Sequence, residues 1–278
     1  MKKTNIILFS LVILLFNLPV MAQWPPFPTP NVPMTSSGEP DLDASAPRTS
    51  WGDPDLSGIW ERYGGFGGNQ NSEDGEEEEL DPNAPPQATF FDLGANMEDG
   101  LPYTQWALDL KTARMANNMK DNPDALCLPI GYMQLHQHPQ PHKIIQTPEL
   151  IVMIWESNGG LRQIFMDGRA LPDDDPLPWW YGYSIGRWEG DTLVVESNGF
   201  RDDVWLDVNG SPLTGTGKIT ERFTRDTFGH MTVDTTIEDP QSYTEAFTVR
   251  VEHGIMLDTD LFEFICKENE QSSQYFDP

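Results

Sequence analysis

Three histidines lie close together in the stretch LHQHPQPHK, where His136, His138 and His142 follow an H-x-H-x3-H spacing. On an extended chain, side chains two residues apart point to the same side, so His136 and His138 would face one ligand together. Three imidazoles with an open fourth position are the ligand set of a catalytic zinc site. Pro139 and Pro141 interrupt any strand here, which leaves the direction of His142 open. The spacing fits either a zinc site or three surface histidines, and we expect no cofactor unless it is this zinc.

Ser184 is a second candidate, because the residues GYSIG from Gly182 to Gly186 fit the G-x-S-x-G pattern of a serine-hydrolase nucleophile elbow. An elbow needs a strand before the serine and a helix after it. Here the loop PDDDPLPWWY precedes the motif and EGDTLVVES follows it, with Gly190 placed to supply the positive φ of a turn. The context predicts a β-hairpin rather than a catalytic serine.

Carboxylates and arginines on predicted strands are the next candidates. Inside a barrel, burial would force them to pair or to shift their pKa values, which is how acid and base sites arise. In FTVRVEH, however, Phe247, Val249 and Val251 alternate with polar residues, as in a strand with one solvent face. If the protein is an enzyme, we expect its acid, base and oxyanion-holding groups among Glu156, Asp167, Arg169, Glu196, Arg222 and Glu263.

Aromatic residues are plentiful, with nine Trp, seven Tyr and fourteen Phe. Trp179-Trp180-Tyr181 belongs to a loop flanked by Pro and Asp, so these rings either stack on a flat ligand or close one end of the core. The candidate ligand contacts are Trp60, Trp155, Trp179, Trp180 and Trp188.

The elements that must position these residues are mostly strands. One helix is predicted near 104–118, with Thr104 as its N-cap and with Trp106 and Met115 on an apolar face. From about residue 142 onward, short segments rich in Val, Ile, Thr and aromatics alternate with turn residues. With one earlier strand, they predict an antiparallel meander of about 8–10 strands that closes into a barrel or sandwich. The strand segments are DLSGIWER, KIIQT, LIVMIWE, LRQIFMD, YSIGRWE, TLVVES, KITERFTRD, HMTVDTTIE, FTVRVEH and LFEFICKE.

The beginning of the chain predicts export. Lys2 and Lys3 precede an apolar run and then small residues, which is typical of a secretory signal peptide over 1–22. The apolar run is too short for a comfortable membrane span, so we expect a periplasmic or extracellular protein without stable membrane insertion. The next segment, 23–50, is rich in Pro, Ser and Thr and predicts a disordered leader.

We expect a single β-barrel domain over 51–270, with an acidic low-complexity loop at 64–86 and a tail at 271–278. The sequence has 17 basic and 44 acidic residues, for a formal net charge of −27. Such a surface repels phosphate backbones, which excludes nucleic acid as a partner. Oligomeric state is left open by the sequence.

Only two cysteines, Cys127 and Cys266, are present. Because an exported protein meets an oxidising compartment, one disulfide is the expected state, and it would tie the segment after the helix to the last strand. Spacing alone does not prove pairing, so two buried thiols are the alternative.

Two resemblances accompany these patterns. Gly58-x-Trp60 in DLSGIW resembles the G-x-W signature that opens lipocalin-type barrels, in which the Trp packs at the closed end, usually near an Arg of the last strand. In this sequence the last predicted strand ends in Cys266-Lys267 instead. Over about 51–270, the chain is also similar to a group of poorly characterised bacterial exported proteins. The shared patterns are DLSGIW, CLPIG, IIQTPELIVMIWE, MDGR, GRWEGDTLVVES and CKEN.

The second resemblance implies no activity, whereas the first implies a barrel around a small ligand. We therefore expect a lipocalin-like barrel that binds a small, largely apolar or aromatic molecule. The alternative is a hydrolase, lyase or isomerase with acid–base groups in the barrel, and a third possibility is a partner-binding surface protein. Titratable side chains that converge inside the barrel would favour the enzyme. An apolar interior would favour the small-molecule binding protein, and a filled barrel without a cavity would favour the partner-binding surface protein.

Overall fold

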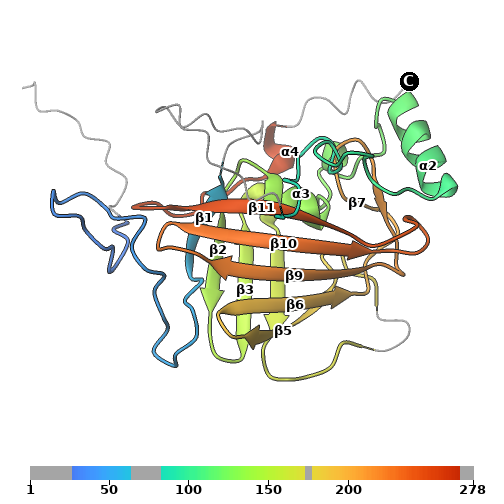
Figure 1. The fold of residues 1–278 in the computed structure, drawn as a ribbon. Coiled ribbons are helices and arrows are strands. Elements are labelled where there is room, and N and C mark those ends of the chain that lie inside the picture. The colour runs from blue at the N-terminus through green and yellow to red at the C-terminus, as the bar shows by residue number, and fades with distance from the viewer. Residues whose placement is uncertain (1–26, 64–82, 173–176, 270–278) are drawn as a thin grey trace, which may run out of the picture.

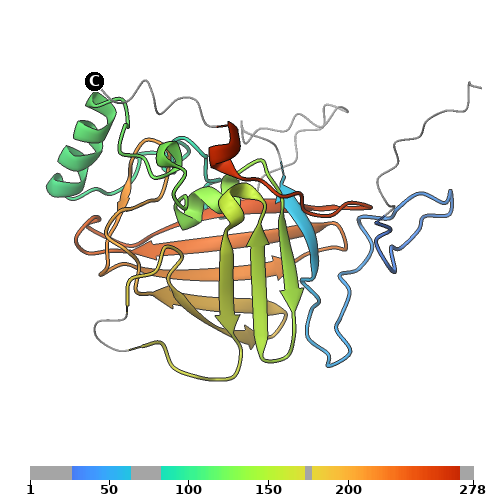
Figure 2. The ribbon, with the colours of Figure 1, turned by 180° about the vertical axis from the view of Figure 1, so that it is seen from behind.

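A computed structural model describes residues 27–63, 83–172 and 177–269. The expected signal peptide, most of the acidic loop and the tail at 271–278 lie outside these residues. The chain forms a closed nine-stranded barrel with its helices on one side (Figures 1 and 2), which confirms the expected mainly β barrel. The barrel strands are β1 (Gly58–Arg62), β2 (His142–Gln146), β3 (Leu150–Trp155), β4 (Leu161–Phe165), β5 (Tyr183–Glu189), β6 (Thr192–Asn198), β9 (Lys218–Arg225), β10 (His230–Glu238) and β11 (Phe247–Met256).

The strand order around the barrel is β1-β11-β10-β9-β6-β5-β4-β3-β2, and β1 closes it by pairing with both β2 and β11. Neighbours are antiparallel except β4 and β5, which run parallel and pair only through Ile164 with Ser184 and Phe165 with Ile185. β4 and β5 therefore run in the same direction from the same end of the barrel. A separate two-stranded sheet consists of β7 (Val204–Trp205) and β8 (Pro212–Leu213).

One expected strand is absent from the described part of the chain. After β11, residues 257–265 have no regular structure and lead into the short helix α4 (Cys266–Asn269). The segment LFEFICKE has a strand-like alternation, but both edges of β11 are already paired, with β1 and β10. No ladder position is left for it, and Phe262 and Phe264 are exposed.

The expected helix near 104–118 is confirmed as α2 (Gln105–Ala116), and the Thr104 hydroxyl caps it by accepting from the Ala107 N–H at 3.3 Å. Its orientation differs from the expected one, because Trp106 and Met115 are exposed. Instead, Arg114 faces the body of the protein, where its guanidinium lies 4.4 Å from the centre of the Trp205 ring. The aliphatic part of the Arg114 side chain, rather than the Trp106 or Met115 side chain, is thus buried against the body of the protein.

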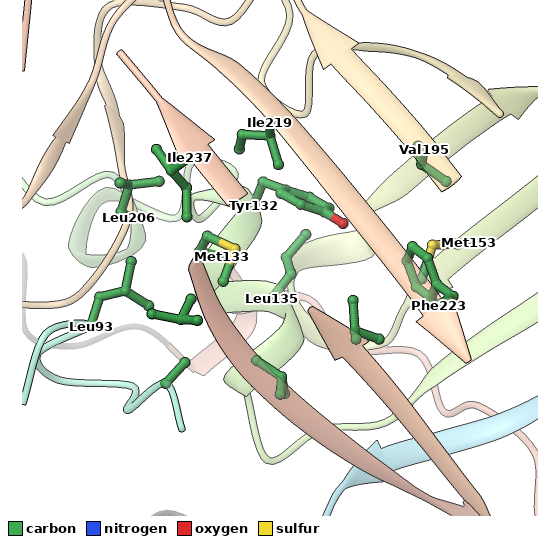
Figure 3. Close-up of a cluster of buried hydrophobic side chains, with 14 of the residues drawn as sticks. Leu93, Tyr132, Met133, Leu135, Met153, Val195, Leu206, Ile219, Phe223 and Ile237 are labelled. Atoms are coloured by element: carbon green, nitrogen blue, oxygen red, sulfur yellow. The ribbon is translucent and has the colours of Figure 1, made fainter. Parts of the chain in front are cut away.

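A second helix, α3 (Tyr132–Gln137), was not predicted from the sequence. All of its side chains are buried, so it shows no amphipathic periodicity. It lies near the end of the barrel where β2 begins (Figures 1 and 2). Tyr132, Met133 and Leu135 pack among inward-facing side chains of β3, β6, β9 and β10 (Figure 3). Two single-turn helices complete the described elements, η2 (Asp124–Leu126) and η3 (Ser157–Gly159).

The described part of the leader, 27–50, differs from the expected disorder. The N–H groups of Phe228 and Gly229 donate to the carbonyl oxygens of Ala44 and Leu42 at 2.7 and 2.8 Å. The leader therefore follows the β9–β10 turn, where backbone hydrogen bonds offset part of its ordering entropy.

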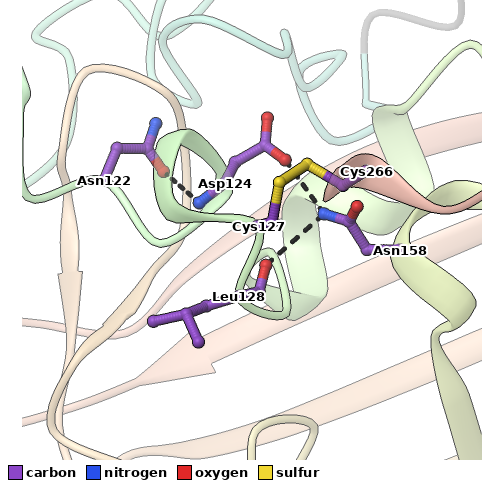
Figure 4. Close-up of a disulfide and its surroundings, with 6 residues drawn as sticks. All are labelled: Asn122, Asp124, Cys127, Leu128, Asn158 and Cys266. Atoms are coloured by element: carbon purple, nitrogen blue, oxygen red, sulfur yellow. Dashed lines mark hydrogen bonds between the residues drawn. A yellow bond between two sulfur atoms is a disulfide. The ribbon is translucent and has the colours of Figure 1, made fainter. Parts of the chain in front are cut away.

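The expected disulfide between Cys127 and Cys266 is confirmed, with the two Cα atoms 5.5 Å apart (Figure 4). It ties the end of η2 to α4, not to a strand. Beside it, the Asn158 amide donates to the Asp124 carboxylate at 2.9 Å. A loop of this length stabilises the fold by about 4–5 kcal/mol in the chain-entropy model.

None of the helices in the described ranges is long and apolar enough to span a membrane.

Candidate functional site

The barrel interior contains a network of polar side chains centred on Arg162. Strand alternation on β4 turns this side chain inward, where it is buried. Its Nε donates to Ser184 Oγ at 3.0 Å, and its Nη2 donates to Ser197 Oγ at 2.9 Å and to Glu221 Oε2 at 2.5 Å. Its Nη1 donates to the hydroxyl of Tyr132, whose ring centre lies 4.2 Å from the guanidinium carbon. Four elements, α3, β5, β6 and β9, therefore meet at one cation.

Ser184 has a structural role in this network. It lies within β5, fully buried, and its Oγ also shares a 2.8 Å hydrogen bond with Ser197 Oγ. β5 and β6 form the predicted hairpin around Gly190. Since no strand–helix elbow exposes the hydroxyl, the G-x-S-x-G match does not mark a nucleophile.

Glu221 is the buried carboxylate of the network. In β9 its side chain points inward, on the same face as those of Ile219 and Phe223. Its Oε2 contacts Arg162, whereas its Oε1 lies 3.4 Å from His136 Nε2 without a hydrogen bond to any described residue. Burial raises the pKa of Glu221 well above its usual value.

Three histidines from distant parts of the chain meet beside this carboxylate: His136 on α3, His142 on β2 and His253 on β11. His136 Nδ1 lies 3.3 Å from His253 Nε2, and the ring centres of His142 and His253 are 4.9 Å apart. Burial lowers the pKa of all three, to about 3 for His142. The imidazoles are therefore neutral at neutral pH.

The predicted zinc set of His136, His138 and His142 does not come together. His138 is only half-buried and packs edge-on against Phe90, with ring centres 5.4 Å apart. His136 Nε2 is 2.5 Å from the Tyr132 hydroxyl, so neither of its ring nitrogens is available as a ligand. Among the residues that the structure describes, no group of three or more His, Cys, Asp or Glu side chains is arranged to hold a metal ion.

Several buried polar atoms of this interior have no hydrogen-bond partner among the described residues: His142 Nε2, Trp155 Nε1, Glu221 Oε1 and Thr235 Oγ1. They form two pairs: Thr235 lies opposite Glu221 across β9 and β10, and Trp155 stacks on His142 with ring centres 5.6 Å apart. Unpaired buried groups are rare in folded proteins and mark functional or strained places. We call the side chains of Tyr132, His136, His142, Arg162, Glu221 and His253 the interior network.

A cavity of about 250 Å³ adjoins the interior network where β4 and β5 begin. Arg162, which belongs to the interior network, lines this cavity. So does Ser184, which accepts a hydrogen bond from Arg162. Gly182 turns the chain here with φ +71°, and a Cβ at this position would meet the Phe200 ring at 2.7 Å, so only glycine fits. We call this space the aromatic cavity, because its other lining side chains include Phe165, Trp179, Trp180, Tyr181 and Tyr183.

Cations hold the rim of the aromatic cavity. The Arg169 guanidinium lies 3.8 Å from the centre of the Phe165 ring and donates to the Tyr183 hydroxyl at 2.9 Å. Arg201 lies 4.6 Å from the centre of the Trp180 ring. Such cation–π contacts restrict the motion of the two rings.

Two of the candidate ligand contacts, Trp179 and Trp180, line this cavity, and Trp155 belongs to the interior. Trp188 is partly buried against the core. Trp60 is fully buried, with its ring centre 4.9 Å from the Arg225 guanidinium. A Trp beneath an Arg is what the G-x-W resemblance implies, although this Arg comes from β9 and not from the last strand.

The candidate carboxylates and their arginines lie outside the barrel. Asp167 pairs with Arg169, Glu196 with Arg187, and Arg222 with Glu189 on half-exposed or exposed side chains. Glu156 accepts from the Phe262 N–H at 2.9 Å, and Glu263 is exposed. The structure does not bring these groups together.

The interior network includes residues that the sequence analysis did not select, namely Tyr132, Arg162, Glu221 and His253. A signal was present for the strand residues. His253 follows Phe247, Val249 and Val251 at every second position of β11, so it lies on the same inward face. Glu221 likewise lies on the same inward face of β9 as Ile219 and Phe223. No local pattern marks Tyr132, because α3 is buried on every side.

Comparison of the chain with protein-family models, with curated proteins and with solved structures finds no match.

Proposed function

We propose that the protein is an exported binding protein for a small, flat molecule, which it holds in the aromatic cavity. The observation that carries this proposal is the composition of the cavity, where five aromatic side chains line the walls together with three polar residues, Arg162, Gln163 and Ser184. Ligand sites are mostly apolar and have a few fixed polar groups that set orientation. The aromatic cavity has this composition.

The volume favours a ligand smaller than a drug-sized compound. Sites for such compounds enclose about 300–1,000 Å³, whereas this cavity encloses about 250 Å³. Trp179 is 47% exposed, so its ring is available for stacking. Tyr181 adds a buried hydroxyl that has no hydrogen-bond partner among the described residues, and burial raises its pKa to about 12. It therefore stays protonated and acts as a neutral donor.

Calorimetric titration with benzoate, benzamide and cyclohexanecarboxylate tests the proposal. We expect a flat ring to bind more tightly than the puckered cyclohexane ring, and Trp179→Ala to weaken its binding about tenfold through lost stacking. Trp106→Ala is the matched control, because Trp106 is 44% exposed but lies on α2. Equal weakening by both variants, or no binding of any probe, would contradict the proposal.

A second candidate function is an acid–base enzyme of the hydrolase, lyase or isomerase type. It is favoured by one contact in the interior network, where a carboxylate with a raised pKa lies 3.4 Å from the neutral imidazole of His136. Arg162 links this pair to the cavity lining. Acid–base catalysis requires such tuned groups within hydrogen-bond reach of a substrate.

The variant Tyr132→Phe separates the two functions. In an enzyme, Tyr132→Phe would lower kcat by 10²-fold or more in the general acid–base range while ligand affinity is retained. In a binding protein, the ligand is recovered chemically unchanged after prolonged incubation, and Tyr132→Phe alters affinity alone. Mass spectrometry of the recovered ligand decides between these results.

A further inference from the structure

A second and larger cavity lies on the outside of the barrel, between the leader and the end of the described chain. Its volume is about 580 Å³. The leader, blue in Figure 1, runs along the side of the barrel where β1 lies and forms one wall. β1, β2, the end of β9 and the segment after β11 form the others. We call it the leader pocket, and it shares no lining residue with the aromatic cavity.

The leader is fastened across this pocket by a reciprocal pair of hydrogen bonds. The Thr29 N–H donates to Asp258 Oδ1 at 2.9 Å, and the Asp258 N–H donates to Thr29 Oγ1 at 2.8 Å. Asp258 adopts a left-handed backbone conformation, with φ 53°, to make this contact. Two chain segments that are 229 residues apart are therefore held together at the rim of the leader pocket.

Positive charge gathers in the leader pocket, against the character of the whole chain. Its lining contains Arg48, Lys143 and Arg225 but only two carboxylates, Asp55 and Asp260. The local balance is three positive minus two negative charges, or +1, in a chain whose formal net charge is −27. A site of net charge +1 suits a singly charged anion.

Arg225 is the cation without a carboxylate partner. Arg48 pairs with Asp191 at 2.7 Å and Lys143 with Asp260 at 2.8 Å. Arg225 is only 6% exposed, and its hydrogen bonds go to backbone carbonyls, among them that of Asp55 at 2.5 Å. Nε, Nη1 and Nη2 each donate to a carbonyl. Three of the five guanidinium N–H groups satisfy these contacts, which leaves two for another acceptor.

The remaining walls of the leader pocket are largely apolar. They are contributed by prolines of the leader and by larger side chains of the barrel and its edges. A small inorganic anion would leave this apolar surface exposed to water, whereas an aliphatic chain would be stabilised by burying it. The larger apolar lining side chains are Phe27, Ile59, Phe228, Ile255 and Met256.

We propose that the leader pocket binds a small amphipathic carboxylate, with its carboxylate at Arg225 and Lys143 and its aliphatic chain along the apolar wall. A guanidinium presents parallel N–H donors that match the two oxygens of a carboxylate. Lys143 is half-exposed, so it can exchange Asp260 for a ligand. This site does not depend on the proposed function of the aromatic cavity.

Titration with decanoate and with 1-decanol at 150 mM salt tests this site. We expect decanoate to bind about tenfold more tightly than the uncharged alcohol. Lys143→Met should weaken decanoate binding about tenfold while leaving decanol unchanged, because it removes charge but keeps an apolar stem. Lys218→Met is the matched control, since Lys218 is an exposed lysine at the other end of β9. Arg225 is left intact because it also holds the turn after β9.

A space-filling variant locates the probe. Thr259→Trp places a large ring in the lining of the leader pocket and should abolish decanoate binding, whereas Trp179→Ala should not affect it. Equal affinity for decanoate and decanol, unchanged binding in Thr259→Trp, or loss of binding in Trp179→Ala would each overturn the proposal. Failure of benzoate to bind the aromatic cavity leaves these outcomes unaffected.

Discussion

Glu221 and Arg222 are consecutive residues of β9, yet they belong to two different electrostatic environments. Glu221 contacts Arg162 at 2.5 Å inside the barrel, where the two side chains are 0% and 1% exposed. Arg222 contacts Glu189 at 3.1 Å on the outer face, where the side chains are 48% and 43% exposed. Both are arginine–glutamate pairs, and the largest difference between them is burial.

Burial changes what such a pair contributes. Outside, water solvates each partner, and the pair adds little to stability. Inside, each charge has lost its hydration, so removing one partner leaves the other without compensation. Burial shifts the pKa values of both inner partners, whereas outside the barrel the hydrogen bond from Arg222 lowers the pKa of Glu189. Type and spacing of residues therefore do not identify the site until the face of each strand is known.

The largest expected effect comes from breaking the inner pair. Glu221→Gln keeps the side-chain shape but leaves the Arg162 charge buried without a counterion, and we expect the free energy of unfolding to fall by about 3–5 kcal/mol. Urea denaturation measures it. The double variant Arg162→Met, Glu221→Leu should recover most of this loss, because two apolar side chains replace the pair. A loss below about 1 kcal/mol for Glu221→Gln would show that the pair is not buried as described.

Acidification has the next largest expected effect. Burial lowers the pKa of His142 to about 3, against an unfolded value near 6.5, so below pH 6.5 the unfolded chain binds a proton that the folded chain does not. His142 therefore contributes stability above pH 6.5 that is lost as the pH falls, by about 2 kcal/mol at pH 5. His136 and His253, whose pKa values burial also lowers, act in the same direction. Burial raises the pKa of Glu221, which acts in the opposite direction and offsets part of the loss.

Denaturant titrations between pH 7.5 and pH 4.5 check this dependence. His142→Gln removes one of these protons, so its free energy of unfolding should fall less steeply with decreasing pH, by about 1.4 kcal/mol per pH unit. The same slope in wild type and variant would mean that the imidazole of His142 is reached by water in the folded protein.

The smallest effect is expected outside the barrel. Arg222→Gln should lower the free energy of unfolding by less than about 1 kcal/mol, and the difference should shrink in 1 M NaCl, where charges on the surface are screened. The loss in Glu221→Gln should persist in the same salt, since a buried charge is screened much less. A large, salt-insensitive effect of Arg222→Gln would remove the distinction between the two faces.

The strands could be predicted from the sequence because periodicity is a local property. In KITERFTR, the alternation that identifies the strand also places Glu221 with Ile219 and Phe223, so the inward carboxylate was within reach of the sequence. LFEFICKE shows the limit of that reasoning. Its alternation is strand-like, but whether a partner edge is free depends on β1, which is far away in the chain.

The candidate site as a whole could not be predicted, because its contacts are between distant segments. His136 and His253 are 117 residues apart, and their 3.3 Å contact follows from barrel closure. α3, which brings His136 and Tyr132 into the interior, has no polar face to give a periodic signal. The H-x-H-x3-H spacing therefore identified two members of the histidine cluster, His136 and His142. It added His138 in place of His253, the third member.

The disulfide has a consequence for the connectivity of the chain. Cys127 and Cys266 are 139 residues apart, and among the barrel strands only β1 lies outside the covalent ring that they close. A protease that cuts any one loop between β2 and β11 therefore leaves a single covalent molecule, whose pieces separate only after reduction. β1 precedes the ring on the same chain and also pairs with β2 and β11, so a single nick within the ring leaves every strand of the barrel attached.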